Sequence, residues 1–136
     1  MLKIIIGFNR GVLTMAKPWQ AWLGLLVAVN LVPPFFFLGT LEAKVVLVGF
    51  VVSIAIMLGL FAKFGYVRLL GLGHAPWLFT VPWIWSRLGE VTSTGPFYYW
   101  LLGVVILDGI SLLIDAVDVV RYARGDRKAS VTVESV

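Results

Sequence analysis

Residues 45–62 read VVLVGFVVSIAIMLGLFA, an unbroken apolar stretch without a charged side chain. A helix of about 20 apolar residues crosses the hydrocarbon core of a bilayer, so this stretch predicts a membrane-spanning helix. The composition agrees, because 60% of the 136 residues are hydrophobic and only 13% are charged. Soluble domains have about 45–50% apolar and about 25% charged residues, and so short a chain cannot bury the excess inside itself. We therefore expect an integral membrane protein.

Three further apolar stretches accompany this one, over about residues 19–38, 69–86 and 97–120. The stretch over 69–86 is the least regular, because residues that break helices interrupt it. These are Gly71, Gly73, Pro76 and Pro82. Membrane helices tolerate such residues where neighbouring helices satisfy the freed backbone groups. A re-entrant loop is the alternative to a crossing at this segment.

The distribution of basic residues favours four crossings. With four, one side of the membrane holds nine basic residues and the other side holds two. The larger set is Lys3, Arg10, Lys17, Lys63, Arg68, Arg121, Arg124, Arg127 and Lys128, and the smaller set is Lys44 and Arg87. Basic residues concentrate on the cytoplasmic side of a membrane. Both termini are therefore expected in the cytoplasm, with the chain in a cell membrane of the bacterial inner-membrane type.

The predicted architecture is all-α, an integral membrane four-helix bundle over residues 18–123 preceded by a surface helix. Residues 1–17 predict an amphipathic interfacial helix, because Lys3, Arg10 and Lys17 share one helical face with Gly7 and Thr14. Cations on such a face lie near lipid phosphates. A cleavable signal peptide is the alternative reading of this segment.

The C-terminal end of the chain is polar. Arg121 and Arg124 follow the last apolar stretch, so we expect them, like the N-terminal cations, to contact lipid headgroups. Residues 124–136 contain small and polar residues and predict a disordered tail. The basic residues flank apolar segments, so membrane lipids explain them and a nucleic-acid partner is not expected.

The last apolar stretch differs from the others because it contains acids. Asp108, Ser111, Asp115 and Asp118 fall on one helical face at 100° per residue. Asp108 is expected near the bilayer midplane, where a charge costs about 2.5–3.5 kcal/mol. The functional hypothesis is a path for protons or cations. The structural alternatives are that Asp115 bonds across helices and that Asp118 pairs with Arg121 or Arg124.

Two polar residues on other segments are candidates for the same path. His74 is the only histidine, and its expected depth matches that of Asp115, so a His–Asp pair that relays protons is possible. The alternative is a hydrogen bond from His74 to a carbonyl freed by Pro76. Asn30 precedes the prolines at 33 and 34 at mid-depth, where it could join a polar centre. Ser53 and Thr80 fall at similar depth.

The residue inventory argues against several kinds of chemistry. The chain has no cysteine and one histidine. These exclude thiolate sites, a bis-histidine haem and the usual zinc sites, so we expect no metal and no cofactor.

Three functional hypotheses remain. The first is an oligomeric channel or proton-coupled transporter for small solutes, and the second is an anchor or accessory subunit bound to another membrane protein. The third is a membrane enzyme acting on a lipid or quinone, although no catalytic motif supports it. A homo-oligomer is expected from size and symmetry. Small residues four apart, Gly49 with Ser53 and Ala55 with Gly59, would allow close helix contacts.

Overall fold

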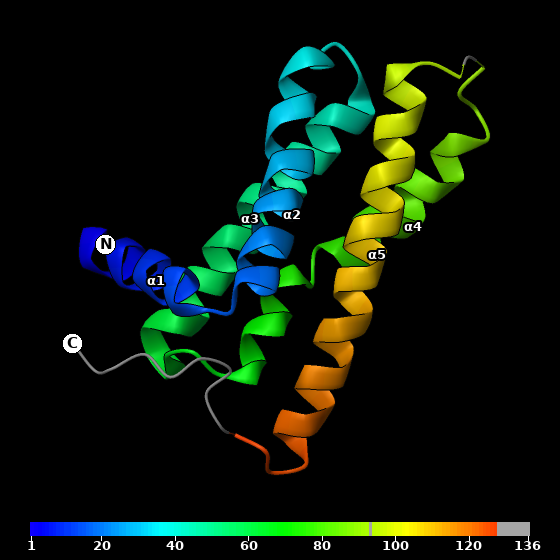
Figure 1. The fold of residues 1–136 in the computed structure, drawn as a ribbon. Helices are drawn as coiled ribbons and strands as arrows, with labels where there is room; N and C mark the ends of the chain where they lie inside the picture. Colours follow the sequence, from blue (N-terminus) through cyan, green and yellow to red (C-terminus); the bar gives the residue numbers. More distant parts are fainter. Residues whose placement is uncertain (93, 128–136) are drawn as a thin grey trace.

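The computed structural model of the protein describes residues 1–92 and 94–127, and every regular element in that part is a helix. The elements are α1 (Leu2–Thr14), α2 (Lys17–Phe36), α3 (Leu41–Phe64), the 3₁₀ helix η1 (Arg68–His74), α4 (Trp77–Leu88) and α5 (Pro96–Ala123). Figure 1 shows α2 rising through the bundle, with α3 and α5 descending. The predicted all-α bundle is confirmed. Residues 128–136 of the predicted tail lie outside the described residues.

The protein is embedded in a membrane. Within the described part of the chain, three helices are long and apolar enough to span a bilayer, namely α2, α3 and α5. Each matches an apolar stretch predicted from the sequence, although the ends differ by a few residues.

The third predicted span is not the single helix expected over residues 69–86. It consists of η1, with seven residues, and α4, with twelve, which meet at Ala75 and Pro76. Proline has no N–H to donate and its ring clashes with the preceding turn, so a continuous α-helix ends there. Because α3 ends in the lower half of Figure 1 and α5 begins at the top, η1 and α4 together return the chain. The segment therefore reverses the chain direction as a crossing would, but in two pieces.

Local signals explain where the long helices begin and end. Proline occupies the first turn of both α2 and α5, where its missing N–H costs nothing. Thr40 caps α3 by accepting a hydrogen bond from the Ala43 N–H at 3.3 Å. Gly65 ends α3 with a φ of +70°, a backbone conformation that glycine adopts without the clash of a Cβ atom.

The prolines within α2 are accommodated by a neighbouring helix. Pro33 cannot donate to the carbonyl four residues earlier, which belongs to Val29. The indole N–H of Trp100 on α5 donates to that carbonyl at 3.0 Å. A backbone group that the proline frees in an apolar environment is thus satisfied by a side chain from another helix.

An apolar core lies between α3, α4 and α5, which meet in the upper half of Figure 1. Its centre comprises Ile84 of α4 with Leu101 and Val104 of α5, all of which have no solvent-exposed surface. Ala43 and Val46 of α3 complete it. The three helices are therefore held together near the ends that α3 and α5 share.

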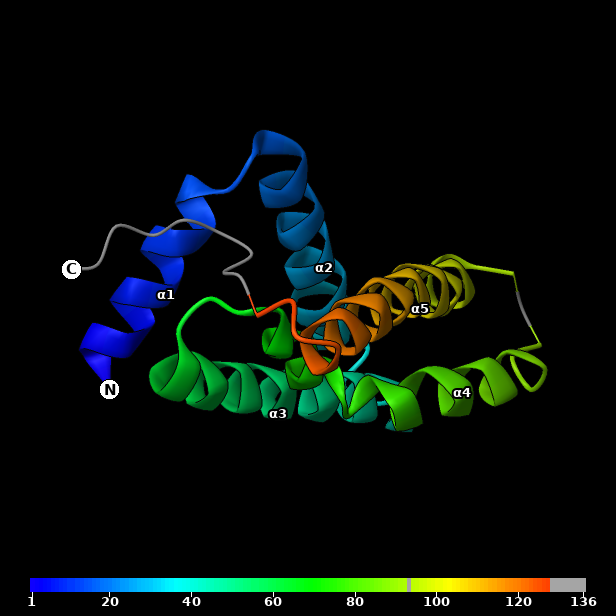
Figure 2. The ribbon, with the colours of Figure 1, turned by 90° about the horizontal axis from the view of Figure 1, so that it is seen from below.

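Helix α1 lies beside the lower half of the bundle and meets the end of α3, as Figure 2 shows from below. The ring of Phe8 packs edge-on against Phe61, with centroids 5.5 Å apart, and stacks on Tyr66 at 5.6 Å. The Tyr66 hydroxyl donates to the carbonyl oxygen of Phe8. Gly11 is buried directly against the Tyr66 ring, where a Cβ atom would overlap it. The contacts of Tyr66 and Phe61 with Phe8 and Gly11 therefore fix α1 to the bundle.

The predicted surface helix is present, with two differences from the prediction. It ends at Thr14, and Lys17 is instead the first residue of α2. Gly7, predicted on the cationic face, instead contacts Phe61. The reason is that two glycines four apart let α1 approach the aromatic rings, which turns this face toward the protein. Lys3 itself remains exposed.

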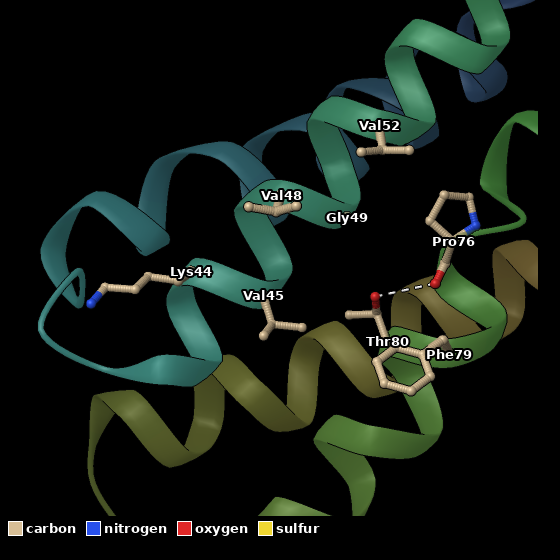
Figure 3. Close-up of a pocket in the computed structure, with 8 residues that line it drawn as sticks. All are labelled: Lys44, Val45, Val48, Gly49, Val52, Pro76, Phe79 and Thr80. Atoms are coloured by element: carbon tan, nitrogen blue, oxygen red, sulfur yellow. Dashed lines mark hydrogen bonds between the residues drawn. The ribbon is translucent and has the colours of Figure 1, made fainter.

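A groove of about 440 Å³ runs between α3 and α4 on the outer surface (Figure 3). Gly49 lies opposite Thr80 there, and a Cβ atom at Gly49 would be 3.0 Å from the threonine hydroxyl. That hydroxyl donates to the carbonyl of Pro76 at 3.2 Å, the bond drawn in Figure 3. Gly49 thus serves contacts within one chain, whereas Ala55 and Gly59 are exposed.

Candidate functional site

The polar residues predicted at mid-depth include one directly bonded pair between α2 and α5. The Asn30 amide donates to Asp108 Oδ1 at 2.8 Å and to the Leu26 carbonyl at 3.1 Å. Asn30 and Asp108 are 1% and 0% exposed. A carboxyl group is therefore held in the interior of the bundle by a neutral donor, and no basic side chain of the described residues is bonded to it.

The second oxygen of this carboxyl group is also buried. Asp108 Oδ2 has no hydrogen-bond partner within residues 1–92 and 94–127. The hydroxyl of Ser53 and the indole N–H of Trp77 are likewise buried without a partner in the described chain. Buried polar groups without partners are rare in folded proteins and mark places where a proton, a solute or water has a role.

Asp115 and His74 form a second pair, nearer the lower end of α5. His74 Nδ1 hydrogen-bonds with Asp115 Oδ2 at 2.7 Å. The histidine ring stacks on Trp77 of α4 with centroids 4.2 Å apart, which fixes its plane. Gly71 makes the approach possible, because a Cβ atom there would be 3.0 Å from the Cβ of Asp115. The His–Asp pair considered from the sequence is thus present in the structure.

The alternative partner for His74, a carbonyl freed by Pro76, is not the one found. The carbonyl four residues before Pro76 belongs to Leu72, and it accepts the backbone N–H of Ala75 at 3.0 Å. The switch to 3₁₀ geometry satisfies this carbonyl within three residues. The histidine side chain is consequently available for Asp115.

Asp118 forms an ion pair with a residue that the sequence did not suggest. Arg68 Nη1 lies 2.5 Å from Asp118 Oδ1, and Arg68 Nε lies 3.3 Å from Asp126 Oδ2. Arg121 pairs with Asp126 at 3.1 Å rather than with Asp118. The predicted pairing of Asp118 with Arg121 or Arg124 is therefore wrong, because η1 brings a cation from another segment across the face of α5.

These groups line a cavity of about 840 Å³ in the lower half of the bundle. Its walls come from α1, α2, α3, η1 and α5 together with the linker that carries Tyr66. Ser111, His74 and Asp115 form one part of the lining, and Arg68 and Asp118 form another. The cavity thus brings together polar groups from segments that are distant in the sequence.

The acids on α5 and Ser111 form an ordered series that we call the acidic column: Asp108, Ser111, Asp115 and Asp118. Asp108 is fully buried, while the side chains of Asp115 and Asp118 are 18% and 29% exposed. Ser111, which lines the cavity, lies three residues, or about 4.5 Å of helix rise, from Asp108. The column therefore runs from the cavity to the buried carboxyl group.

The residues predicted to contact lipid headgroups all lie at the surface. Lys3, Arg10, Lys17, Arg121 and Arg124 are exposed. The N-terminal cations belong to α1 and the start of α2, near mid-height in Figure 1, and the others belong to the end of α5, at its bottom. Their positions are compatible with the predicted contact to a membrane surface.

Several residues of the site were absent from the sequence prediction. Arg68, Tyr66 and Trp22 line the cavity, but nothing in their local sequence separates them from ordinary interfacial residues. At the opposite end of the bundle, Glu42 is 7% exposed and bonds Arg87 at 2.8 Å. A buried acid at the start of an apolar helix was a detectable signal for this second ion pair.

Neither similarity to known proteins nor a metal site indicates the function, so the geometry of the site is the basis for the proposal below. No family model, no curated protein and no solved structure matches the chain. Across the described residues, no group of three or more histidine, cysteine or acidic side chains could hold a metal ion.

Proposed function

We propose that this protein is a small membrane transporter that conducts protons along the acidic column. The observation that supports this most directly is the position of Asp108. It is completely buried among the helices, has one neutral donor, and lies one helical turn beyond a residue that lines the cavity. An ionisable group inside a membrane bundle is a functional site by default, because the bilayer makes it costly to keep.

The geometry suggests an order of proton transfer. A proton entering at the cavity first meets Asp118, which is paired with Arg68, and then the bonded pair of Asp115 and His74. Imidazole can take a proton on one nitrogen and release one from the other, which suits a relay. From there the serine hydroxyl at position 111 lies toward Asp108.

Proton uptake at Asp108 would change the contact between α2 and α5. As a carboxylate, Asp108 accepts the Asn30 amide hydrogen with Oδ1. As a carboxylic acid it is neutral and can donate a hydrogen itself, so its hold on the amide weakens. Because Asn30 lies just before the prolines that interrupt α2, we expect the upper part of this helix to move relative to α5 when the proton binds.

The distribution of charge supports an orientation for the proposed path. The exposed cations belong to α1, the start of α2 and the end of α5, elements that also contribute to the walls of the cavity. Since basic residues favour the cytoplasmic side, the cavity is proposed to open to the cytoplasm.

The anchor hypothesis receives less support from the contacts. It requires acids on α5 to pair with basic residues of another protein. Each of the three acids already has a partner within this chain: Asn30 for Asp108, His74 for Asp115 and Arg68 for Asp118. Asp115 and Asp118 therefore need no basic residue of another protein, and Asp108, whose partner is neutral, is completely buried and out of its reach.

Proton flux in liposomes tests the proposal. The purified protein is reconstituted with a pH-sensitive dye inside, and an imposed pH gradient should collapse faster than in protein-free vesicles. Asp108→Asn, which keeps the shape but cannot exchange a proton, should lower that rate at least tenfold. Glu42→Gln is the matched control, because Glu42 is also a buried acid but lies at the opposite end.

Two results would contradict the proposal. One is a wild-type rate equal to that of empty vesicles. The other is an Asp108→Asn variant that elutes as a single species, keeps its helical content and still transports protons at the wild-type rate.

A further inference from the structure

The cavity beside the acidic column has largely apolar walls, which suit an organic molecule better than a file of water molecules. Trp19, Trp22 and Leu23 of α2 face Ile114 of α5 and Met57 of α3 across it. Its volume of about 840 Å³ falls within the range of about 300–1,000 Å³ that is typical of sites for drug-sized ligands. Aromatic and aliphatic walls with a few polar groups are the usual composition of such sites.

The charged groups of the cavity fall into two sets. Arg68, Asp118 and Arg121 form the first, and their charges are compensated by one another and by Asp126, at 2.5 Å, 3.3 Å and 3.1 Å. Together with Asp126, this set comprises two cations and two anions. It therefore adds little net charge to whatever occupies the cavity.

Asp115 belongs to the second set and differs from the first. Its Oδ2 bonds His74, but Oδ1 has no hydrogen-bond partner in the described part of the chain. Gly71 leaves that oxygen uncovered, since a Cβ atom there would lie 3.1 Å from it. Ser111, which is 4% exposed, also lines the cavity beside it, and its hydroxyl has no side-chain bond to the described residues. One carboxylate oxygen and one hydroxyl thus remain for a ligand.

We infer that the cavity binds an amphipathic organic cation, an amine or onium compound with an aromatic or bulky apolar body. This inference rests on the proposed function and names the substrate class of the same site. The positive centre lies at Asp115 and Ser111, and the apolar body lies against Trp19 and Trp22. Coulomb attraction to the carboxylate and cation–π contacts with indole rings both favour such a ligand.

The same groups discriminate against an organic anion of equal size. An anion would meet the uncovered oxygen of Asp115, with Asp108 next along the column, and would gain little from Arg68 and Arg121. Both arginines are already engaged by Asp118 and Asp126. A like charge without compensation in a low-dielectric site is strongly unfavourable.

Two ions of matched shape and opposite charge test the inference. Tetraphenylphosphonium and tetraphenylborate have nearly the same size and apolar surface. In detergent, equilibrium dialysis or calorimetry should show the phosphonium binding at least tenfold more tightly than the borate. Asp115→Asn should weaken phosphonium binding at least tenfold, and Glu42→Gln should leave it unchanged. Equal affinity for the two ions, or wild-type affinity in Asp115→Asn, would overturn the assignment.

A second variant keeps the inference testable if Asp115→Asn does not fold. Ile114→Trp adds bulk to the cavity wall and alters no charge. It should abolish phosphonium binding while the helical content and elution volume stay unchanged. Wild-type affinity in a folded Ile114→Trp protein would show that the ion binds elsewhere.

The binding experiment and the proton-flux experiment test the two proposals separately. If Asp108→Asn abolishes flux and the phosphonium does not bind the wild type, the substrate class is wrong and the transporter proposal stands. If the phosphonium binds through Asp115 and the wild type carries no protons, the cavity assignment stands and the transporter proposal fails.

Discussion

The two halves of α5 lie in different surroundings, the first in a packed core and the second beside a cavity. Its first half, up to Leu107, contributes the fully buried Leu101 and Val104 to an apolar core, at the end of the bundle where Glu42 pairs with Arg87. Its second half carries the acidic column beside a cavity of about 840 Å³. One helix thus anchors the fold at one end and presents ionisable groups at the other.

This difference indicates that the two ends of the bundle have different roles, one in stability and the other in binding and proton transfer. Close packing excludes alternative arrangements of the helices in the upper half, because a filled core resists displacement. The lower half can then leave space and retain charged groups without losing the fold. Changes in the upper half should therefore affect stability, and changes in the lower half should affect ligand binding and proton transfer.

The largest stability effect is expected from paired truncations of α5. Leu101→Ala removes a fully buried side chain and should lower the free energy of unfolding by about 2–5 kcal/mol. Ile114→Ala, at the cavity wall, enlarges a space that already exists and should lose at most about half as much. Unfolding titrations in mixed detergent micelles measure both. Equal losses would break the comparison between the halves.

The next effect concerns the bond between α5 and the interrupted helix α2. Trp100→Phe leaves the Val29 carbonyl without its donor, and a buried carbonyl without a partner costs about 1–3 kcal/mol. Trp85→Phe is the control, because Trp85 is 68% exposed. The same unfolding titration should separate the two variants. A Trp100→Phe protein as stable as Trp85→Phe would show that the prolines need no help from α5.

A smaller effect is expected where α1 joins the lower half. Tyr66→Phe keeps the ring contacts with Phe8 and Phe61 but removes the hydroxyl that donates to Phe8. The loss of one hydrogen bond should weaken the docking of α1 by about 1 kcal/mol. Hydrogen exchange of residues 2–14 should rise about fivefold, while exchange in α5 stays unchanged. Unchanged exchange in α1 would assign its docking to the ring contacts alone.

The smallest effect appears only in strong alkali. Burial raises the pKa of the Tyr66 phenol from 10.0 to about 12, opposed by a backbone hydrogen bond at Val12. Because the folded protein favours the neutral phenol, this contribution to stability is complete below pH 10 and is lost between pH 10 and about 12. Phenolate absorbance should show a step near pH 12 that Tyr66→Phe lacks. If Tyr66→Phe instead lost phenolate absorbance near pH 10, the ordinary pKa of a phenol, the burial would be contradicted.

Most of the fold was predictable because it depends on patterns local to each segment. Apolar length located α2, α3 and α5, and helical periodicity placed Asp108 and Asp115 on one face. The division of the third span was only partly predictable. Pro76 marked the break, but the use of a 3₁₀ helix before it depends on the close packing of Gly73 against Met57.

The site was less predictable than the fold because its partners are distant in sequence. The bond between Asn30 and Asp108 joins residues 78 apart, and the pair of Arg68 and Asp118 joins residues 50 apart. The expected depth in the membrane suggested that Asn30 lies near Asp108 and that His74 lies near Asp115, because few other polar residues share those depths. It failed for Asp118, because several cations share its depth and only the placement of η1 decides among them.

The short helix α4 has a consequence for the surrounding lipid. Its twelve residues span about 18 Å, whereas the hydrocarbon core of a bilayer measures about 30 Å. Leu78, Phe79 and Trp85 point outward from this helix, at 67%, 70% and 68% exposed. Lipids on this flank therefore meet a shorter apolar wall than lipids beside the 28-residue α5. Such hydrophobic mismatch thins the bilayer locally, so the protein should favour membranes with short acyl chains and deform thicker ones on one side.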